Sequence, residues 1–177
     1  MTMEKRFTIT QDVLEISCIL SVPDNADIRR LVLGVHGFGG SAEDAIQAGL
    51  AEEMELFYAA MLRFDFPGHG NSPMDSDAFM PDNAKACILI AAEYLKALYP
   101  QVEDLCIFAT GFGAYCTLAV LPELLELPGK IKLVVQTPSV RMDETLLAMM
   151  RVTRETFWAM EKFTFPTARP FHVTYRF

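Results

Sequence analysis

Hydrophobic residues follow two patterns along this chain. Near the start they alternate with polar residues, in two segments, RFTIT and LEISCILSVP, that flank Gln11-Asp12. This period-2 spacing predicts two strands at the start of the chain, which we take as a hairpin. Further along, apolar residues form short continuous runs at 31–36, 59–66, 105–110 and 131–137. Such runs are typical of strands that are covered on both faces of a parallel sheet.

Candidate helices separate these runs, at about 41–58, 81–98 and 111–125. Ser41 is a candidate N-cap of the first helix, and Pro81 suits the first turn of the second. The alternation of strands and helices predicts an α/β fold. We expect three layers, with a mostly parallel sheet that starts with an antiparallel N-terminal hairpin.

The pattern changes after Pro138. Residues 142–163 are predicted to form one long helix or two short ones. The apolar residues near one face of this segment are Leu146, Met150, Phe157 and Met160. Methionine packs adaptably, so the segment is interpreted either as a mobile cover over a ligand pocket or as an ordinary core helix. Residues 171–177 alternate like a short strand.

Length and charge limit the classes of function. The chain has 177 residues, with 15 Lys and Arg against 23 Asp and Glu, and a formal net charge of −8. This length fits one domain with a sizeable core. The excess of acidic residues and the lack of a basic cluster argue against a surface that binds nucleic acid.

The cysteines lie in apolar stretches, at positions 18, 87, 106 and 116. With no C-x-x-C and no histidine at a ligand spacing, we expect buried thiols, no metal site and no disulfide framework. No apolar signal core follows Met1, which predicts a cytoplasmic protein. Residues 105–122 are uncharged, but Gly111 and Gly113 divide them, so we interpret them as a buried strand, turn and helix rather than a membrane span.

Three glycine-containing turns follow three of the predicted buried strands. They are HGFGG at 36–40, DFPGHGNS at 65–72 and ATGFGA at 109–114. The carboxyl ends of the strands are where an open α/β sheet binds its ligands. Glycine lets the backbone fold tightly and point N–H groups into a pocket, which suits an oxyanion.

These turns resemble those of the α/β-hydrolase superfamily, most closely its small esterase and acyl-hydrolase branch with a helical cap. HGFGG is similar to the oxyanion turn, DFPGHGNS to the D-x-P-G-H-G-x-S loop, and residues 109–113 to the nucleophile elbow G-x-S-x-G. The resemblance implies an oxyanion hole made by the backbone N–H groups of Phe38 and Phe112. It also implies that His36, Gly37 and Gly113 support these turns.

The sequence departs from the family at the residues that react. Gly111 occupies the nucleophile position, and glycine has no atom that can attack a carbonyl. Thr110 points away from the site in such an elbow, and Cys116 is expected in the core. The family places an acid and then a histidine after the nucleophile, for which Asp143 and His172 are the only candidate pair. Their simpler interpretations are a helix start for Asp143 and the polar side of a strand for His172.

We therefore expect residues 1–137 to form an α/β-hydrolase core that lacks the last strands of the family. Residues 138–177 would be a partial cap and a strand-like tail of the same domain. By resemblance the activity is hydrolysis of a carboxylic ester, absent or strongly impaired in this chain, with no cofactor. The alternative is a non-catalytic protein that binds a small acyl or ester ligand. Nucleotide binding through GFGAYC at 111–116 has less support, because the acidic residues that follow fall at a helix end.

An incomplete sheet would leave the edge of its last strand unpaired. Such an edge can pair with another chain. The sequence therefore predicts a homo-oligomer, in which residues 171–177 are a candidate added strand.

Overall fold

A computed structural model describes residues 2–24, 27–174 and 177. Its main sheet has six strands: β1 (Thr2–Gln11), β2 (Leu14–Pro23), β3 (Arg30–Val35), β4 (Ala59–Phe64), β5 (Asp104–Thr110) and β6 (Lys130–Gln136). The strand order is β1-β2-β4-β3-β5-β6. Strands β3 to β6 are parallel, whereas β1 and β2 form an antiparallel hairpin that joins the sheet through β4. The predicted mostly parallel sheet with its N-terminal hairpin is confirmed.

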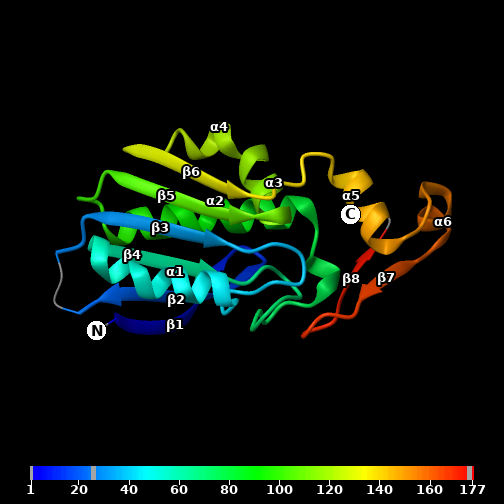
Figure 1. Ribbon diagram of the computed structural model, residues 1–177, viewed down its shortest axis with the longest axis horizontal. Helices are drawn as coiled ribbons and strands as arrows, with labels where there is room; N and C mark the ends of the chain where they lie inside the picture. The colour runs from blue at the N-terminus through cyan, green and yellow to red at the C-terminus, as the bar shows by residue number, and fades with distance from the viewer. Residues whose placement is uncertain (1, 25–26, 175–176) are drawn as a thin grey trace.

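Helices cover both faces of this sheet. They are α1 (Ala45–Glu53), α2 (Pro81–Leu98), α3 (Gly111–Ala119) and α4 (Leu121–Leu124), with 3₁₀ turns η1 (Met54–Phe57) and η2 (Ser76–Ala78). Figure 1 shows α1 on one face and α2 on the other. The second predicted helix has the expected bounds, with Pro81 in its first turn. The three-layer arrangement is therefore confirmed.

The predicted start of the first helix is wrong. The helix begins at Ala45, not after Ser41, and its N-cap residue Asp44 makes no side-chain cap hydrogen bond. The Ser41 hydroxyl instead accepts the amide of Glu43 at 3.2 Å. The carboxylate of Asp65 accepts a hydrogen bond from the Ala42 amide at 2.7 Å. This contact holds the residues before Ala45 as a turn.

The last strand of the sheet is also different from the prediction. Strand β6 was expected to be covered on both faces, yet its residues are half-buried or exposed. Val134 is 50% exposed and Val135 is 37% exposed, because no strand of the described chain lies beyond β6. The edge needed for self-association is therefore present, and the oligomer itself stays a prediction.

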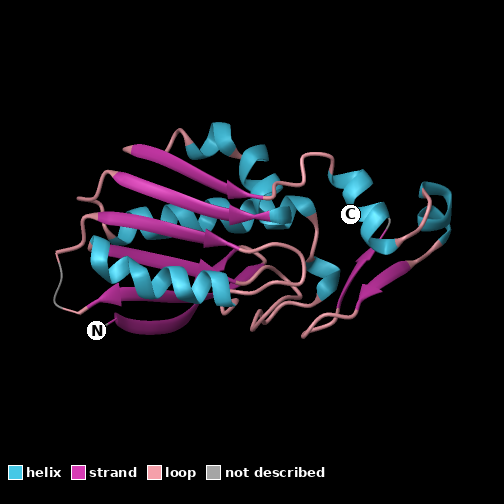
Figure 2. Ribbon diagram, in the orientation of Figure 1, coloured by secondary structure: helices cyan, strands magenta, loops and turns pink. Residues whose placement is uncertain are grey.

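The remaining elements lie beyond the carboxyl ends of the parallel strands, where the strand arrows of Figure 1 point. They are α5 (Met142–Met150), α6 (Arg154–Ala159), β7 (Lys162–Phe165) and β8 (Phe171–Thr174). The predicted helical segment is thus two short helices, separated at Arg151, which has a left-handed backbone with φ 56°. Strand β8 pairs antiparallel with β7 in the same chain, and Figure 2 shows this hairpin apart from the main sheet.

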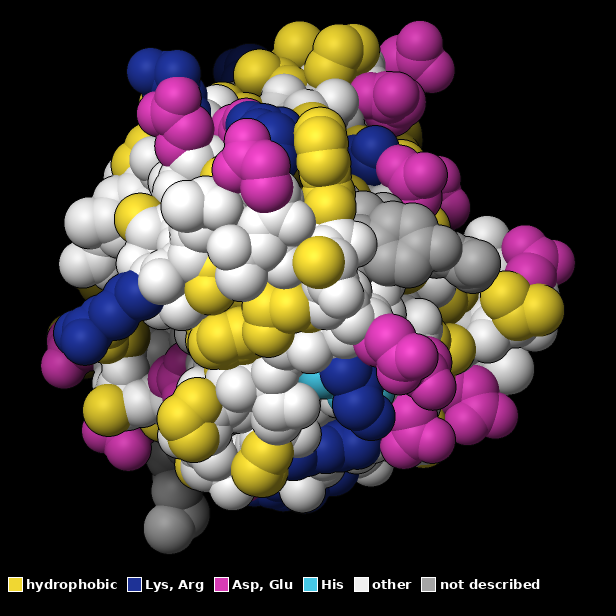
Figure 3. Space-filling view, turned by 90° about the vertical axis from the view of Figure 1, so that its right-hand side faces the viewer, with side chains coloured by type: hydrophobic (Ala, Val, Ile, Leu, Met, Phe, Trp, Pro, Cys, Tyr) yellow, Lys and Arg dark blue, Asp and Glu magenta, His cyan; other side chains and the backbone are white. Residues whose placement is uncertain are grey.

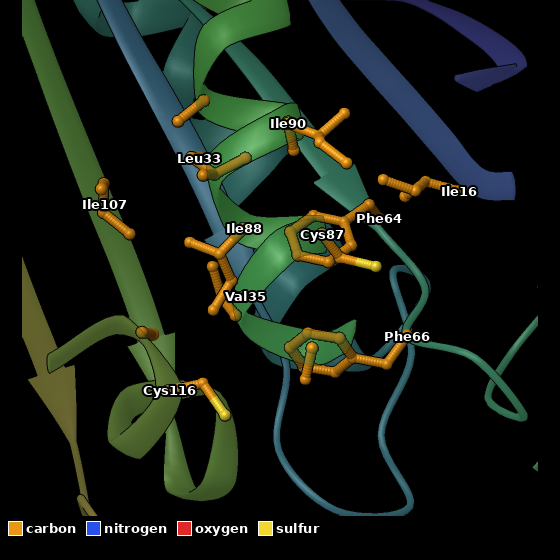
Figure 4. Packing of buried hydrophobic residues seen from close by; sticks show 14 of the residues in the cluster. Ile16, Leu33, Val35, Phe64, Phe66, Cys87, Ile88, Ile90, Ile107 and Cys116 are labelled. Atoms are coloured by element: carbon orange, nitrogen blue, oxygen red, sulfur yellow. The ribbon is translucent and has the colours of Figure 1, made fainter. Parts of the chain in front are cut away.

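The core lies mainly between the sheet and α2. In Figure 4, Ile88 of α2 lies against Leu33 and Val35 of β3, and all three side chains are fully buried. A smaller cluster, which includes Val32 and Met61, covers the α1 face of the sheet. No helix among the described residues is long and apolar enough to span a membrane.

The cysteines give a direct test of this packing. All four are free thiols, and burial raises the pKa of Cys18, Cys87 and Cys116 to about 12. Since the thiolate is the reactive form, we expect a colorimetric thiol reagent to modify only the half-buried Cys106 in the native protein. All four should react in denaturant. Rapid native reaction of more than one thiol would contradict the described core.

Candidate functional site

The three glycine turns lie together at the carboxyl ends of the parallel strands. A Cβ atom added to Gly37 would lie 3.3 Å from the Thr110 carbonyl oxygen and 3.7 Å from the Gly111 Cα. The turn after β3 and the turn after β5 are therefore in van der Waals contact. The fold thus brings the predicted oxyanion turn beside the predicted nucleophile elbow.

The elbow has two glycines with opposite surroundings. Gly111 has a left-handed backbone with φ 49°, and a Cβ added there would meet only the Gly37 Cα within 4 Å, at 3.8 Å. A Cβ added to Gly113 would lie 2.3 Å from the His36 carbonyl oxygen. Position 111 therefore has room for a side chain, whereas position 113 requires glycine because helix α3 starts directly against the end of β3.

His36 makes two hydrogen bonds inside the site and is fully buried. Its Nδ1 lies 2.8 Å from the Gly37 carbonyl oxygen, and its Nε2 lies 3.1 Å from the Phe66 amide nitrogen. A neutral ring that donates from Nδ1 and accepts at Nε2 satisfies both contacts. Burial lowers the pKa of His36 to about 4. Both ring nitrogens are therefore engaged with the backbone, and neither is available to take a proton from residue 111.

His69 lies beside His36, with 5.3 Å between the ring centroids. Its Nδ1 lies 3.0 Å from the Pro67 carbonyl oxygen. Its Nε2 is buried with no partner among the described residues. Burial, together with the nearby His36, lowers the pKa of His69 to about 3. The ring is thus neutral at physiological pH and braces the loop that follows β4.

Asp65 holds that loop against the turn before α1. Its carboxylate accepts the amide of Ala42 at 2.7 Å and the amide of Asn71 at 2.9 Å. Burial raises the pKa of Asp65 above its ordinary value, and these two amide donors oppose the shift. In the same loop the Ser72 hydroxyl accepts the Met74 amide at 3.2 Å.

Sequence reasoning missed Arg169, which ties the C-terminal hairpin to the same loop. Its guanidinium donates to the carbonyl oxygens of His69, Gly70 and Ser72 at 3.2, 3.1 and 2.7 Å. A further contact reaches the Met74 carbonyl oxygen at 3.3 Å. A planar group with five donors suits such a set of carbonyls. The place of Arg169 in the sequence, between β7 and β8, does not predict that it binds this loop.

A cluster of phenylalanine rings fills the space in front of the turns. Phe38 and Phe112, whose amides are the predicted oxyanion donors, stack with 4.6 Å between their ring centroids. The other members with rings near these two are Phe66, Phe79, Phe165, Phe171 and Phe177. Three of them belong to the C-terminal segment, so the apolar cover of the site combines this segment with residues of the main fold.

A cavity of about 230 Å³ adjoins this cluster, between helices α3, α5 and α6. Its apolar walls include Pro81, Tyr115, Leu146, Phe157, Trp158 and Phe177. Asp143 and Arg154 also line it, and their side chains form an ion pair at 2.7 Å. Both charged side chains are about half exposed, and the other side chains that line the cavity are apolar or aromatic.

The candidate acid and base do not pair with each other. Asp143 binds Arg154, which lowers the pKa of Asp143. The Nε2 atom of His172 lies 2.6 Å from the carboxylate of Asp77. Each residue thus has another partner, and the structure gives no contact between Asp143 and His172. No group of three side chains that could hold a metal ion occurs within the described part of the chain.

No protein-family model matches the sequence, and a search of curated proteins finds no match. The fold, however, is similar to that of solved hydrolases. The esterase Est1E from Butyrivibrio proteoclasticus, solved with ferulic acid, gives a TM-score of 0.77 at 21% identity, over 93% of this chain and 66% of that one. The Pyrococcus furiosus esterase Pf2001 gives 0.70 at 20% identity, over 84% and 56%.

Dienelactone hydrolase from Anabaena variabilis gives a TM-score of 0.63 at 15% identity, over 81% of this chain and 67% of that one. The chain thus spans between about half and two thirds of the length of these three proteins. At these identities the likeness concerns the fold alone. The chain therefore has the fold of the α/β-hydrolases.

Proposed function

We propose that this chain is an α/β-hydrolase of the esterase type whose acyl-transfer site has no nucleophile. The observation that carries the proposal is the conformation of the elbow. Gly111 has φ 49° at the junction of a strand and a helix, with space for a side chain toward Gly37. A serine in this position would be the attacking group of the family, and glycine supplies none.

The surrounding groups support an oxyanion site without a proton acceptor. The turn that contains Phe38 lies against the elbow that contains Phe112, so two backbone amides are candidates for binding a carbonyl oxygen. The sequence has three histidines. The Nδ1 atoms of His36 and His69 hydrogen-bond to backbone carbonyl oxygens, and His172 contacts Asp77. A triad requires a histidine that lies beside the nucleophile and is oriented by a carboxylate. None of the three histidines has this arrangement at residue 111.

We expect the unmodified chain to release nitrophenol from 4-nitrophenyl acetate no faster than buffer does. Gly111→Ser should also show no turnover, because a serine without a general base is a weak nucleophile. Gly111→Ala is the matched control, since it adds a Cβ at the same backbone position without a hydroxyl. Clear turnover by the unmodified chain would overturn the proposal. Turnover by Gly111→Ser alone would show that a base is present after all.

The cavity favours a second function, binding without catalysis. It has about 230 Å³ of space and aromatic walls that include Tyr115 and Trp158. Apolar cavities with a few polar groups nearby are the usual form of small-molecule sites. Under this alternative the ligand is a small acyl or ester compound. Saturable binding of a small ester without its hydrolysis would separate a binding protein from an inactive relative that has no ligand.

A further inference from the structure

Phe177 occupies a position between the cavity and the two turns. Its ring centroid lies 5.3 Å from that of Phe112, 5.6 Å from that of Phe38 and 5.2 Å from that of Phe79. The same side chain lines the cavity together with Tyr115. One ring therefore contacts the candidate oxyanion turn and elbow on one side and the cavity on the other.

The ring of Phe177 is held by contacts that another aromatic ring can replace. Aromatic pairs at centroid distances of about 4.5–7 Å contribute roughly 0.5–1.5 kcal/mol each, whether the partner is a side chain or a ligand. Phe177 is half-buried, unlike Phe79 and Phe112, which are 1% exposed. Its amide donates to the Thr174 carbonyl oxygen at 3.0 Å, a contact local to its own segment.

We propose that the cavity and the place of the Phe177 ring together form one binding site for a small aromatic ester, and that the Phe177 ring takes the part of this site nearest the turns when no ligand is bound. The inference rests on the proposed function for the ester group, which would face the turn that contains Phe38. The aromatic ring of the ligand follows from the side chains at the site. Tyr115 and Trp158 line the cavity, and Phe112 contacts the ring of Phe177. Figure 3 shows this end of the molecule, with hydrophobic side chains across its middle.

Size and charge both point to an uncharged ligand with a single ring. An apolar cavity of about 150 Å³ holds a benzene molecule, and this one has about 230 Å³. The Phe177 ring stands against Phe38 and Phe112, so a ligand whose ester reaches the turn that contains Phe38 must displace it. The two charged side chains at the cavity, Asp143 and Arg154, neutralise each other in their ion pair. A free carboxylate would have to compete with Asp143 for Arg154, whereas an ester would not.

The test is a titration with methyl benzoate, an aromatic ester with one ring. Trp158 is the only tryptophan of the chain and lines the cavity, so its fluorescence reports binding directly, and calorimetry gives an independent Kd. We expect Phe177→Ala to bind about tenfold more tightly than the unmodified chain, because a site that its own side chain occupies most of the time has a reduced apparent affinity.

Phe163→Ala is the matched control, because this ring contacts Phe165 in the same hairpin and does not line the cavity. It should bind as the unmodified chain does, and methyl cyclohexanecarboxylate should bind more weakly than methyl benzoate. Circular dichroism establishes that each variant is folded. Equal affinity in all three proteins, or no binding in any folded one, would overturn the inference. Neither result would affect the proposal that the site has no nucleophile at position 111. Ester turnover by the unmodified chain would overturn that proposed function but not the proposed binding site.

Discussion

Replacing Gly113 with alanine is expected to lower the free energy of unfolding by about 2–3 kcal/mol or more. A Cβ there would approach the His36 carbonyl oxygen to 2.3 Å and a Val35 methyl carbon to 2.8 Å. The clash is with the backbone of His36, directly after β3, so side-chain rotation cannot relieve it. The helix α3 and the end of β3 must move apart, which also separates the candidate oxyanion turn from the elbow. Denaturant unfolding followed by circular dichroism measures the change.

Two other glycines provide controls for the same chemical change. Gly49 lies in helix α1 with nothing within 4 Å of an added Cβ, so Gly49→Ala should stabilise the chain by about 0.5–1 kcal/mol. Gly111→Ala meets no close atom but has a left-handed backbone, so a loss of about 1–2 kcal/mol is expected. If Gly113→Ala were as stable as Gly49→Ala, helix α3 could not lie against β3 as described.

These glycines also show how far the sequence alone could predict the site. The sequence has glycine at both 111 and 113, and only the resemblance to the G-x-S-x-G elbow assigns a side chain to position 111. Glycine at 113 is required by the His36 carbonyl, which follows strand β3 and is far from residue 113 in the sequence. The strands themselves were predictable because a continuous apolar run needs cover on both faces. The exposure of β6 was not predictable from its sequence, since it depends on which elements lie next to this strand.

Contacts between distant segments account for the other differences. The first helix starts late because Asp65 binds the amide of Ala42, 23 residues before it. Arg169 binds the carbonyl of His69, 100 residues before it. No local pattern marks either contact, since an arginine between two strands usually lies in solvent. The phenylalanine cluster was missed for the same reason, because Phe38 and Phe177 are far apart in the sequence.

The two buried histidines should make the stability of the chain fall as the pH is lowered. Burial lowers the pKa of His36 to about 4 and, aided by the neighbouring His36, that of His69 to about 3. An unfolded chain has histidines that take up protons near pH 6.5. Below that value the unfolded state binds more protons than the folded state does, so the free energy of unfolding is highest above about pH 6.5 and declines from there toward about pH 3–4.

The expected loss is about 2 kcal/mol for each histidine between neutral pH and about pH 4.5. The raised pKa of Asp65 acts in the opposite direction, so single variants are needed to isolate the histidines. His36→Asn should flatten the dependence of stability on pH, because the amide can donate to the Gly37 carbonyl but does not titrate. His172→Asn is the matched control and should keep the dependence, since this ring contacts the exposed Asp77 outside the buried pair.

A ring proton titration by NMR tests the same point without any variant. In the folded chain the ring signals of His36 and His69 should not shift above about pH 5, because both rings stay neutral there. Titration of either ring near pH 6.5 would show that it is reached by solvent. Its Nδ1 contact to the Gly37 or Pro67 carbonyl would then not hold the ring as a buried neutral donor. The lost stability at low pH would have to come from the carboxylates instead.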